Sequence, residues 1–218
     1  MKKIALLSSL LLFATLTSNV MAQQNRTLTN GTSLNFVIGV PSSSFGSENS
    51  VESDYQYGAL LGFNVGQRWY IKPQENYGFG VMAKWLDVAG TYKSGTMLGN
   101  DWTRAAFDIS FLEVGPIGTY AINCDMAIDV YYNLRPTVLV DLSNQKYSTD
   151  DVTTVYSGFG LTHAIGTAFR WRILNVGVEY VAGSVTSSGS YNGSNNDLTL
   201  PDMDNKANSL RFLLGLKF

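Results

Sequence analysis

The sequence has little charge, a single cysteine and, after its first 22 residues, no long apolar run. Charged residues make up 15% of the chain, whereas an average soluble domain carries about 25%. The chain therefore has few ions with which to cover a water-exposed surface. Cys124 has no second cysteine to pair with, so an internal disulfide is excluded. A net charge of -2 provides no basic surface for nucleic acid.

Sequence motifs for cofactor or metal chemistry are also missing. The chain has neither a Gly-rich phosphate loop that opens a helix nor a Cys/His spacing of the kind that binds zinc. We therefore expect no cofactor, no metal site and no catalytic residue. Beyond the N-terminus, no stretch reaches the roughly 20 apolar residues that a transmembrane helix needs.

The N-terminus has the pattern of a secretory signal. Lys2 and Lys3 precede an apolar run over residues 4–16, and Ala22 ends a short segment with a small residue at the cleavage position. The apolar run is too short for a membrane anchor. We predict a signal peptide over residues 1–22 and a single mature domain over residues 23–218.

The last nine residues form the most regular pattern in the chain. Strands place alternate side chains on opposite faces, so one face of this segment is entirely apolar and the other is mixed. The apolar face comprises Leu210, Phe212, Leu214, Leu216 and Phe218. The mixed face comprises Arg211, Leu213, Gly215 and Lys217. We expect the apolar face to contact lipid.

Seven earlier segments alternate in the same way. They begin near residues 34, 57, 77, 105, 126, 156 and 176. In a membrane, alternating strands are stable only in a closed barrel, where every backbone amide has a partner. The predicted fold is all-β: an eight-stranded antiparallel transmembrane up-and-down β-barrel.

Loop lengths predict the orientation of this barrel. Long polar segments over residues 42–56, 91–103, 141–155 and 186–207 alternate with short turns near residues 72–76, 123–125 and 173–174. Outer-membrane barrels have short periplasmic turns and longer outer loops. Both termini should therefore lie on the periplasmic side. A soluble barrel with an apolar interior is the alternative, but the polar face here is mostly Gly, Asn, Ser and Thr, which suits a narrow lumen.

Charged residues on the polar face should pair inside the lumen, because a buried charge requires a partner. The predicted interior ion-pair plug comprises Lys84, Asp108, Glu113, Asp129, Arg135, Glu179 and Arg211. Strict alternation would expose Glu113 to lipid, so we predict a β-bulge near Phe111 and Leu112 that turns it inward. Pro136 should mark a bulge or a weak point in pairing. Arg68, Arg170 and Lys217 are expected at wet strand ends, without partners.

Aromatic residues are expected to form two girdles at the membrane surfaces. Trp69 and Trp171 lie near short turns, while Trp85 and Trp102 lie near long loops. The single histidine, His163, should face lipid.

Two further groups of residues could carry chemistry. A lipid-facing histidine can assist acyl transfer by a serine two residues on, but Ile165 occupies that position after His163. Asp202 and Asp204 could bind Ca²⁺, although a solvated polar loop is the simpler interpretation. We therefore expect that the protein is not an enzyme.

The closing segment, Phe212 to Phe218, resembles the insertion signal of small outer-membrane β-barrels of the OmpA and OmpX type. Phe111-Leu112-Glu113-Val114 resembles the Leu-Glu-Ile-Pro stretch in the fourth strand of the outer-membrane β-barrel domain family, although Gly115 here separates the valine from Pro116. The resemblance implies the outer membrane of a Gram-negative bacterium. It also implies outer-membrane lipid, the barrel-assembly machinery and periplasmic chaperones as partners, and a monomer.

These observations lead to a ranked set of functions. The first is a plugged barrel with a structural role in the envelope, or a surface-interaction role with a ligand at its outer loops. The alternative is porin-like passage of small or hydrophobic solutes through the barrel. A lipid-modifying enzyme comes third.

Overall fold

The computed structural model describes residues 26–42, 57–97, 100–146, 151–193 and 196–218. The predicted signal peptide and most of the first long loop lie outside these ranges. The described elements are η1 (Arg26–Leu28), β1 (Gly31–Pro41), β3 (Leu60–Ile71), β4 (Tyr77–Met97), β5 (Asn100–Ala121), β6 (Met126–Lys146), β7 (Asp151–Trp171), β8 (Leu174–Ala182), β9 (Ser184–Gly193), β10 (Asn196–Lys206) and β11 (Ser209–Lys217). No helix in this part of the chain is long and apolar enough to cross a membrane.

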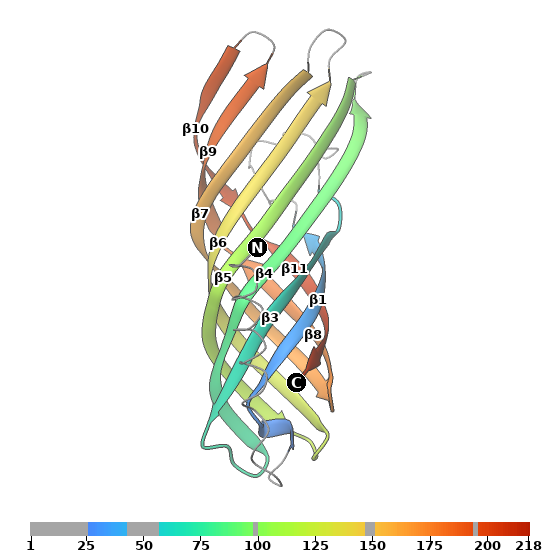
Figure 1. Cartoon of the computed structure of the whole chain (residues 1–218), viewed down its shortest axis with the longest axis vertical. Coiled ribbons are helices and arrows are strands. Elements are labelled where there is room, and N and C mark those ends of the chain that lie inside the picture. The colour runs from blue at the N-terminus through green and yellow to red at the C-terminus, as the bar shows by residue number, and fades with distance from the viewer. Residues whose placement is uncertain (1–25, 43–56, 98–99, 147–150, 194–195) are drawn as a thin grey trace, which may run out of the picture.

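Eight antiparallel strands form a closed ring, as predicted (Figure 1). The order is β1, β3, β4, β5, β6, β7, β8 and β11, and β11 returns to pair with β1. Closure is completed at the very end of the chain, where the Phe218 amide donates to the Thr32 carbonyl and the Thr32 amide donates to the Phe218 carbonyl. The final strand therefore joins the first and last parts of the barrel wall.

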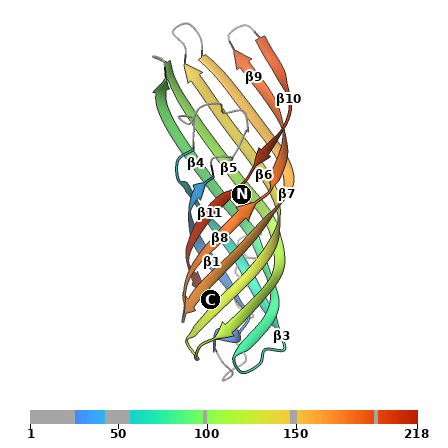
Figure 2. The same cartoon turned by 180° about the vertical axis from the view of Figure 1, so that it is seen from behind.

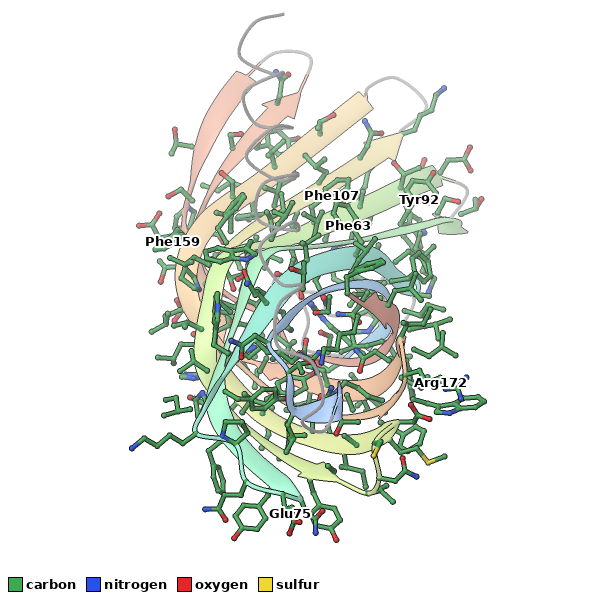
Figure 3. All side chains as sticks on the ribbon, turned by 60° about the horizontal axis from the view of Figure 1, so that its bottom comes forward. Phe63, Glu75, Tyr92, Phe107, Phe159 and Arg172 are labelled. Atoms are coloured by element: carbon green, nitrogen blue, oxygen red, sulfur yellow. The ribbon has the colours of Figure 1, made fainter. Side chains whose placement is uncertain are left out.

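The outer wall is apolar. Along every strand of the ring, exposed large apolar side chains alternate with buried residues of the inner face. The exposed side chains include Phe36, Phe79, Val130, Phe159 and Leu214. Phe159 and Tyr92 project outward near one end of this apolar band, and Glu75 and Arg172 lie at the opposite end, with the short turns (Figure 3). A band of this kind requires hydrocarbon around it, as in transmembrane β-barrels.

Three of the four segments predicted as long loops are largely strands. β4 and β5 continue as a ladder to Met97 and Asn100, and β6 and β7 continue to Lys146 and Asp151. The predicted loop over residues 186–207 is mostly the β9–β10 hairpin. The prediction was wrong because it relied on apolar alternation. Above the membrane both faces of a strand can be polar, and backbone pairing then continues without that signal.

The wall changes partners above the lipid-facing part. β8 pairs with β7 up to Ala182, and after Gly183 the chain continues as β9, which pairs with a higher part of β7. Gly183 has φ of +142°, a backbone conformation in which a residue with a side chain would be strained. β9 and β10 then rise beyond β8 and β11 (Figure 2). The upper parts of β4 to β7, with β9 and β10, form an extension that we call the outer sheet.

Candidate functional site

Two adjacent bulges turn charged residues into the lumen. In β4, Lys84 pairs with Gly66 but Leu86 pairs with Val65, so Lys84 and Asp87 both point inward. In β5, the register shifts between Ser110 and Val114, and Leu112 has φ of +54°. This confirms the predicted bulge, and Glu113 is fully buried.

Pro136 lies opposite the β5 bulge. Its carbonyl accepts a hydrogen bond from the Ser110 hydroxyl at 2.9 Å, so the proline nitrogen also faces β5, where the ladder is already interrupted. On the other side β6 pairs with β7 without a register shift. The weak point predicted at Pro136 therefore affects only one edge of β6.

The bulges create a buried ion-pair network, which we call the central network. Lys84 Nζ lies 2.5 Å from Glu179 and 3.1 Å from Glu113. Arg135 Nε lies 2.5 Å from Glu113. Further ion pairs join Arg211 to Asp87 at 3.0 Å and to Asp108 at 2.5 Å, and join Arg135 to Asp87 and Asp108 at 3.7 and 3.5 Å.

Six of the seven residues predicted to pair inside the lumen belong to this network. The exception is Asp129, which lies in a second cluster. The network also contains Asp87, which was not predicted because it follows Trp85, a residue expected to lie near a long loop. Asp87 resembles Glu113 in its sequence pattern: strict alternation from Lys84 would place the Asp87 carboxylate in lipid, which predicts a bulge before it.

The second cluster, which we call the lower cluster, is centred on Asp129. Arg68 NH1 donates to Asp129 at 2.7 Å, Arg170 donates twice at 2.7 and 2.9 Å, and Thr119 donates at 2.6 Å. Arg68 and Arg170 are nearly fully buried. The expectation that Arg68 and Arg170 would lie unpaired at wet strand ends is wrong, because the lumen side chains exclude water there.

The N-terminal segment covers the lower end of the lumen. Arg170 donates to the Thr27 carbonyl of η1 at 2.7 Å, and Lys217 Nζ donates to the Thr29 carbonyl at 3.0 Å. Lys217 is also buried, so it too differs from the wet strand end that was predicted. These bonds fix η1 and the residues just after it across the end of the barrel that carries the short turns.

A third group crosses the upper lumen, above the apolar band. Arg104 donates to Asp141 through Nε and NH2, at 3.2 and 2.7 Å, and its guanidinium lies 4.2 Å from the centre of the Tyr57 ring. The Tyr57 hydroxyl donates a short hydrogen bond to Asp141. Burial, followed by the nearby Asp141 carboxylate, raises the pKa of Tyr57. We call these three residues the upper latch, and the sequence analysis missed it because Arg104 and Asp141 lay at predicted loop boundaries.

A small polar cavity separates the lower cluster from the central network. A cavity of about 20 Å³ lies between the lower cluster and Lys84, lined by polar groups that include Asn35, Tyr131 and Asn175. This volume holds about one water molecule. The neighbouring Arg68 Nε, Tyr131 hydroxyl and Asn175 Oδ1 have no protein partner and suit such a water.

The tryptophans do not form the two girdles that were predicted. Trp102 is only 5% exposed and points inward, beside Gly95 in the outer sheet. Trp69 and Trp85 pack edge-to-face with ring centroids 6.0 Å apart, so they form one patch on the outer wall. Trp171 is exposed near a short turn. The loop assignment misled the prediction, because β4 continues to Met97, well past Trp85, and Trp102 lies near the outer end of β5, in the outer sheet.

Other predicted residues lie as follows. Leu210, Phe212, Leu214, Leu216 and Phe218 all face outward, but whether they act as an insertion signal stays a prediction.

Cys124 is exposed in a short turn. Asp202 and Asp204 belong to β10, where they accept hydrogen bonds from Ser188 and Thr186. Among the described residues, no cluster of His, Cys, Asp or Glu could hold a metal ion.

The fold and its apolar outer wall define an integral outer-membrane β-barrel protein. The outer membrane protease OmpT from Escherichia coli shares this fold, with a TM-score of 0.56 at 11% identity over 87% of this chain and 95% of that chain. Two structures of Ail, the attachment invasion locus protein of Yersinia pestis, are also similar, with TM-scores of 0.44 and 0.45 at 12% and 13% identity, each over 87% of this chain and 97% of that chain. No protein-family model and no curated protein matches the sequence.

The comparison with OmpT corrects one expectation. The lack of familiar catalytic motifs led to the expectation that the protein is not an enzyme. A protease has the same barrel fold, so that expectation was wrong as an inference from fold and motifs. The residues of an outer-membrane active site need not form a local sequence motif, because different strands can supply them.

Proposed function

We propose that the protein is a sealed barrel that anchors the outer sheet as an interaction surface outside the membrane. The observation that carries this proposal is the continuation of β4 to β7, β9 and β10 beyond the apolar band. A barrel that only filled the membrane would not need paired strands so far above it. The outer sheet would present a folded surface to a ligand, in place of four independent loops.

The chemistry of the outer sheet supports this role. Polar pairs lie on the water-facing side of β9 and β10, where Thr186 is bonded to Asp204 and Ser188 to Asp202. Pro201 and the register shift between Leu200 and Met203 lie on β10, which pairs only with β9 among the described strands. These features discourage edge-to-edge aggregation, so the surface is suited to remain exposed to water.

The arrangement of the lumen supports a seal. η1, the lower cluster, the central network and the upper latch occupy successive levels, and the interior of an eight-stranded barrel is just wide enough for side chains to fill. Water or small ions would have to displace several buried ion pairs to pass. The predicted ion-pair plug therefore stays part of the proposal.

Single-channel conductance of the refolded mature protein in a planar bilayer tests the seal. The unmutated protein and an Arg172→Ala control, which alters only an exposed pair with Asp125, should be silent. Glu113→Ala and Arg135→Ala, which open the central network, should each produce conductance. Steady conductance in the unmutated protein would contradict the seal and favour passage of small solutes.

A truncated outer sheet tests the interaction role. Gly189 and Leu200 are partners in the β9–β10 ladder, so residues 190–199 can be replaced by Asn-Gly, a sequence that favours a tight hairpin. Adhesion and detergent resistance should be compared in cells that carry the full-length or the truncated protein. Loss of adhesion with retained detergent resistance is the expected result. Loss of detergent resistance alone would instead indicate a structural role in the envelope.

A further inference from the structure

Two polar side chains meet on the lipid-facing side of the wall. Tyr132 of β6 and His163 of β7 both point outward, and Tyr132 is 39% exposed. The Tyr132 hydroxyl lies 2.5 Å from His163 Nδ1, and the two rings stack with centroids 5.8 Å apart. Neither residue contributes to the lumen, the outer sheet or closure of the barrel.

The pair lies in the outer part of the apolar band. Along β7, the outward positions run from Trp171, near a short turn, to Phe159, and Ser157 is the first exposed polar residue beyond. His163 is four residues from Phe159. At about 3.3 Å per residue and a tilt near 40°, this places His163 roughly 10 Å below the upper edge of the band. The neighbouring outward residues Leu161 and Ile165 are apolar.

The contact between Tyr132 and His163 leaves one of their polar hydrogens without an acceptor. Neutral histidine has one N–H and tyrosine has one O–H, so the pair has two donors. The contact between them uses one donor. If tyrosine donates, His163 Nε2–H is left over, and if histidine donates, the Tyr132 O–H is left over. Within the described residues, neither side chain has another hydrogen-bond partner.

A third donor lies beside the pair. Tyr180 of β8 is opposite Ile165 in the β7–β8 ladder, and Tyr132 is opposite Ile165 in the β6–β7 ladder, so the two tyrosines flank it. Tyr180 is 45% exposed, and its hydroxyl has no partner in the described part of the chain. A polar hydrogen in hydrocarbon is unfavourable without an acceptor, so the patch favours a ligand rich in acceptor oxygens.

We propose that Tyr132, His163 and Tyr180 form a binding site for an ester-linked acyl lipid. An ester carbonyl is an acceptor with no donor of its own, which complements the spare donors on the patch. Ester groups of the bulk bilayer lie at the edge of the hydrocarbon, so a lipid bound here would hold its carbonyl roughly 10 Å deeper, where the spare donors have no other acceptor. The acyl chain would then pack against Leu161 and Ile165.

Because His163 is the single histidine of the chain, it can be observed selectively. Protein labelled with ¹⁵N-histidine and carrying no histidine tag should be reconstituted in nanodiscs of diacyl phosphatidylcholine, or of the dialkyl ether analogue with the same chain lengths. The ether lipid lacks carbonyl groups. The imidazole ¹⁵N resonances should differ between the two lipids in the unmutated protein, and this difference should shrink in Tyr132→Phe. Identical spectra in both lipids would overturn the proposal.

Lipid selection gives an independent measurement. In mixed nanodiscs, native mass spectrometry should show that the protein retains diacyl lipid over dialkyl lipid by about two- to tenfold, the ratio that one net hydrogen bond provides. His163→Phe should abolish this preference, whereas Leu214→Val, a lipid-facing control on β11 outside the site, should keep it. Gel mobility with and without heating checks that each variant is folded. Equal retention of both lipids by the folded, unmutated protein would contradict the site.

Discussion

Lys84 of β4 is the ladder partner of Glu113 of β5, and their side chains meet inside the barrel at 3.1 Å. Each residue is next to a bulge in its own strand. The two bulges bring a cation and a carboxylate to the same level from strands that would otherwise expose one of them to lipid. The central network therefore depends on backbone irregularity as much as on residue type.

The balance of charge in the central network leads to a first prediction. Its carboxylates, Asp87, Asp108, Glu113 and Glu179, outnumber its cations, Lys84, Arg135 and Arg211. Removing a cation should therefore destabilise the barrel more than removing a carboxylate. Lys84→Met should cost about 3–5 kcal/mol of the free energy of unfolding, and Glu113→Gln should cost less.

Urea unfolding in phospholipid vesicles, followed by tryptophan fluorescence, measures both variants. The double variant Lys84→Met/Glu113→Gln should lose less stability than the sum of the two single variants, because it removes both members of one pair. A larger loss for Glu113→Gln than for Lys84→Met would show that charge balance does not govern the network.

A second prediction concerns the lower cluster. Asp129 is the acid partner of both Arg68 and Arg170, so Asp129→Asn should leave two buried guanidinium groups without a carboxylate. We expect a loss of about 3–5 kcal/mol in the free energy of unfolding. The matched control is Asp125→Asn in the exposed pair with Arg172, which should cost about 0–1 kcal/mol. Equal losses in the two variants, measured by the same urea titration, would contradict the assignment.

Sequence reasoning succeeded where lipid imposes a strict rule. A carboxylate such as Glu113 cannot face hydrocarbon, and the need to turn it inward predicted a bulge that the structure contains. The need to pair every backbone amide likewise predicted a closed ring, and the number of alternating segments predicted its eight strands. The same rule would have found Asp87 if β4 had been recognised past Trp85.

Sequence reasoning failed where lipid no longer imposes that rule. Above the apolar band a polar strand and a polar loop have similar composition, so composition alone predicts loops where the outer sheet lies. The upper latch depends on this region, since Arg104 and Asp141 lie on strands that run beyond the band. The partners of Asp129 were missed for another reason: the side chains that exclude water around Arg68 and Arg170 come from distant strands and from η1.

A third prediction tests the backbone of the β5 bulge. Leu112 has φ of +54°, a region that β-branched residues strongly disfavour. Leu112→Ile keeps an apolar side chain toward lipid and should lower stability by about 1–3 kcal/mol. Leu214→Ile is the control, because Leu214 is similarly exposed, at 59% against 55%, but lies in regular strand. Equal stabilities for the two variants in urea would mean that the bulge tolerates branching.

A fourth prediction uses the upper latch, where burial and the Asp141 carboxylate raise the pKa of Tyr57. In the unfolded chain tyrosine ionises near pH ~10, whereas folded Tyr57 keeps its proton to higher pH. The unfolded state therefore binds fewer protons above this pH, and the contribution of Tyr57 to stability is complete below pH ~10 and falls as pH rises.

Tyr57→Phe removes this titration and isolates its effect. Below pH ~10 the variant should be less stable than the unmutated protein by about 1–3 kcal/mol, because it loses the hydrogen bond to Asp141. By pH 11 the difference should have shrunk by roughly 1.4 kcal/mol from its value well below pH ~10, as the unmutated protein alone loses stability through this group. Urea titrations at half-unit steps from pH 8.5 to 11 provide the measurement. Parallel stability curves for the two proteins would show that Tyr57 is not held protonated by the latch.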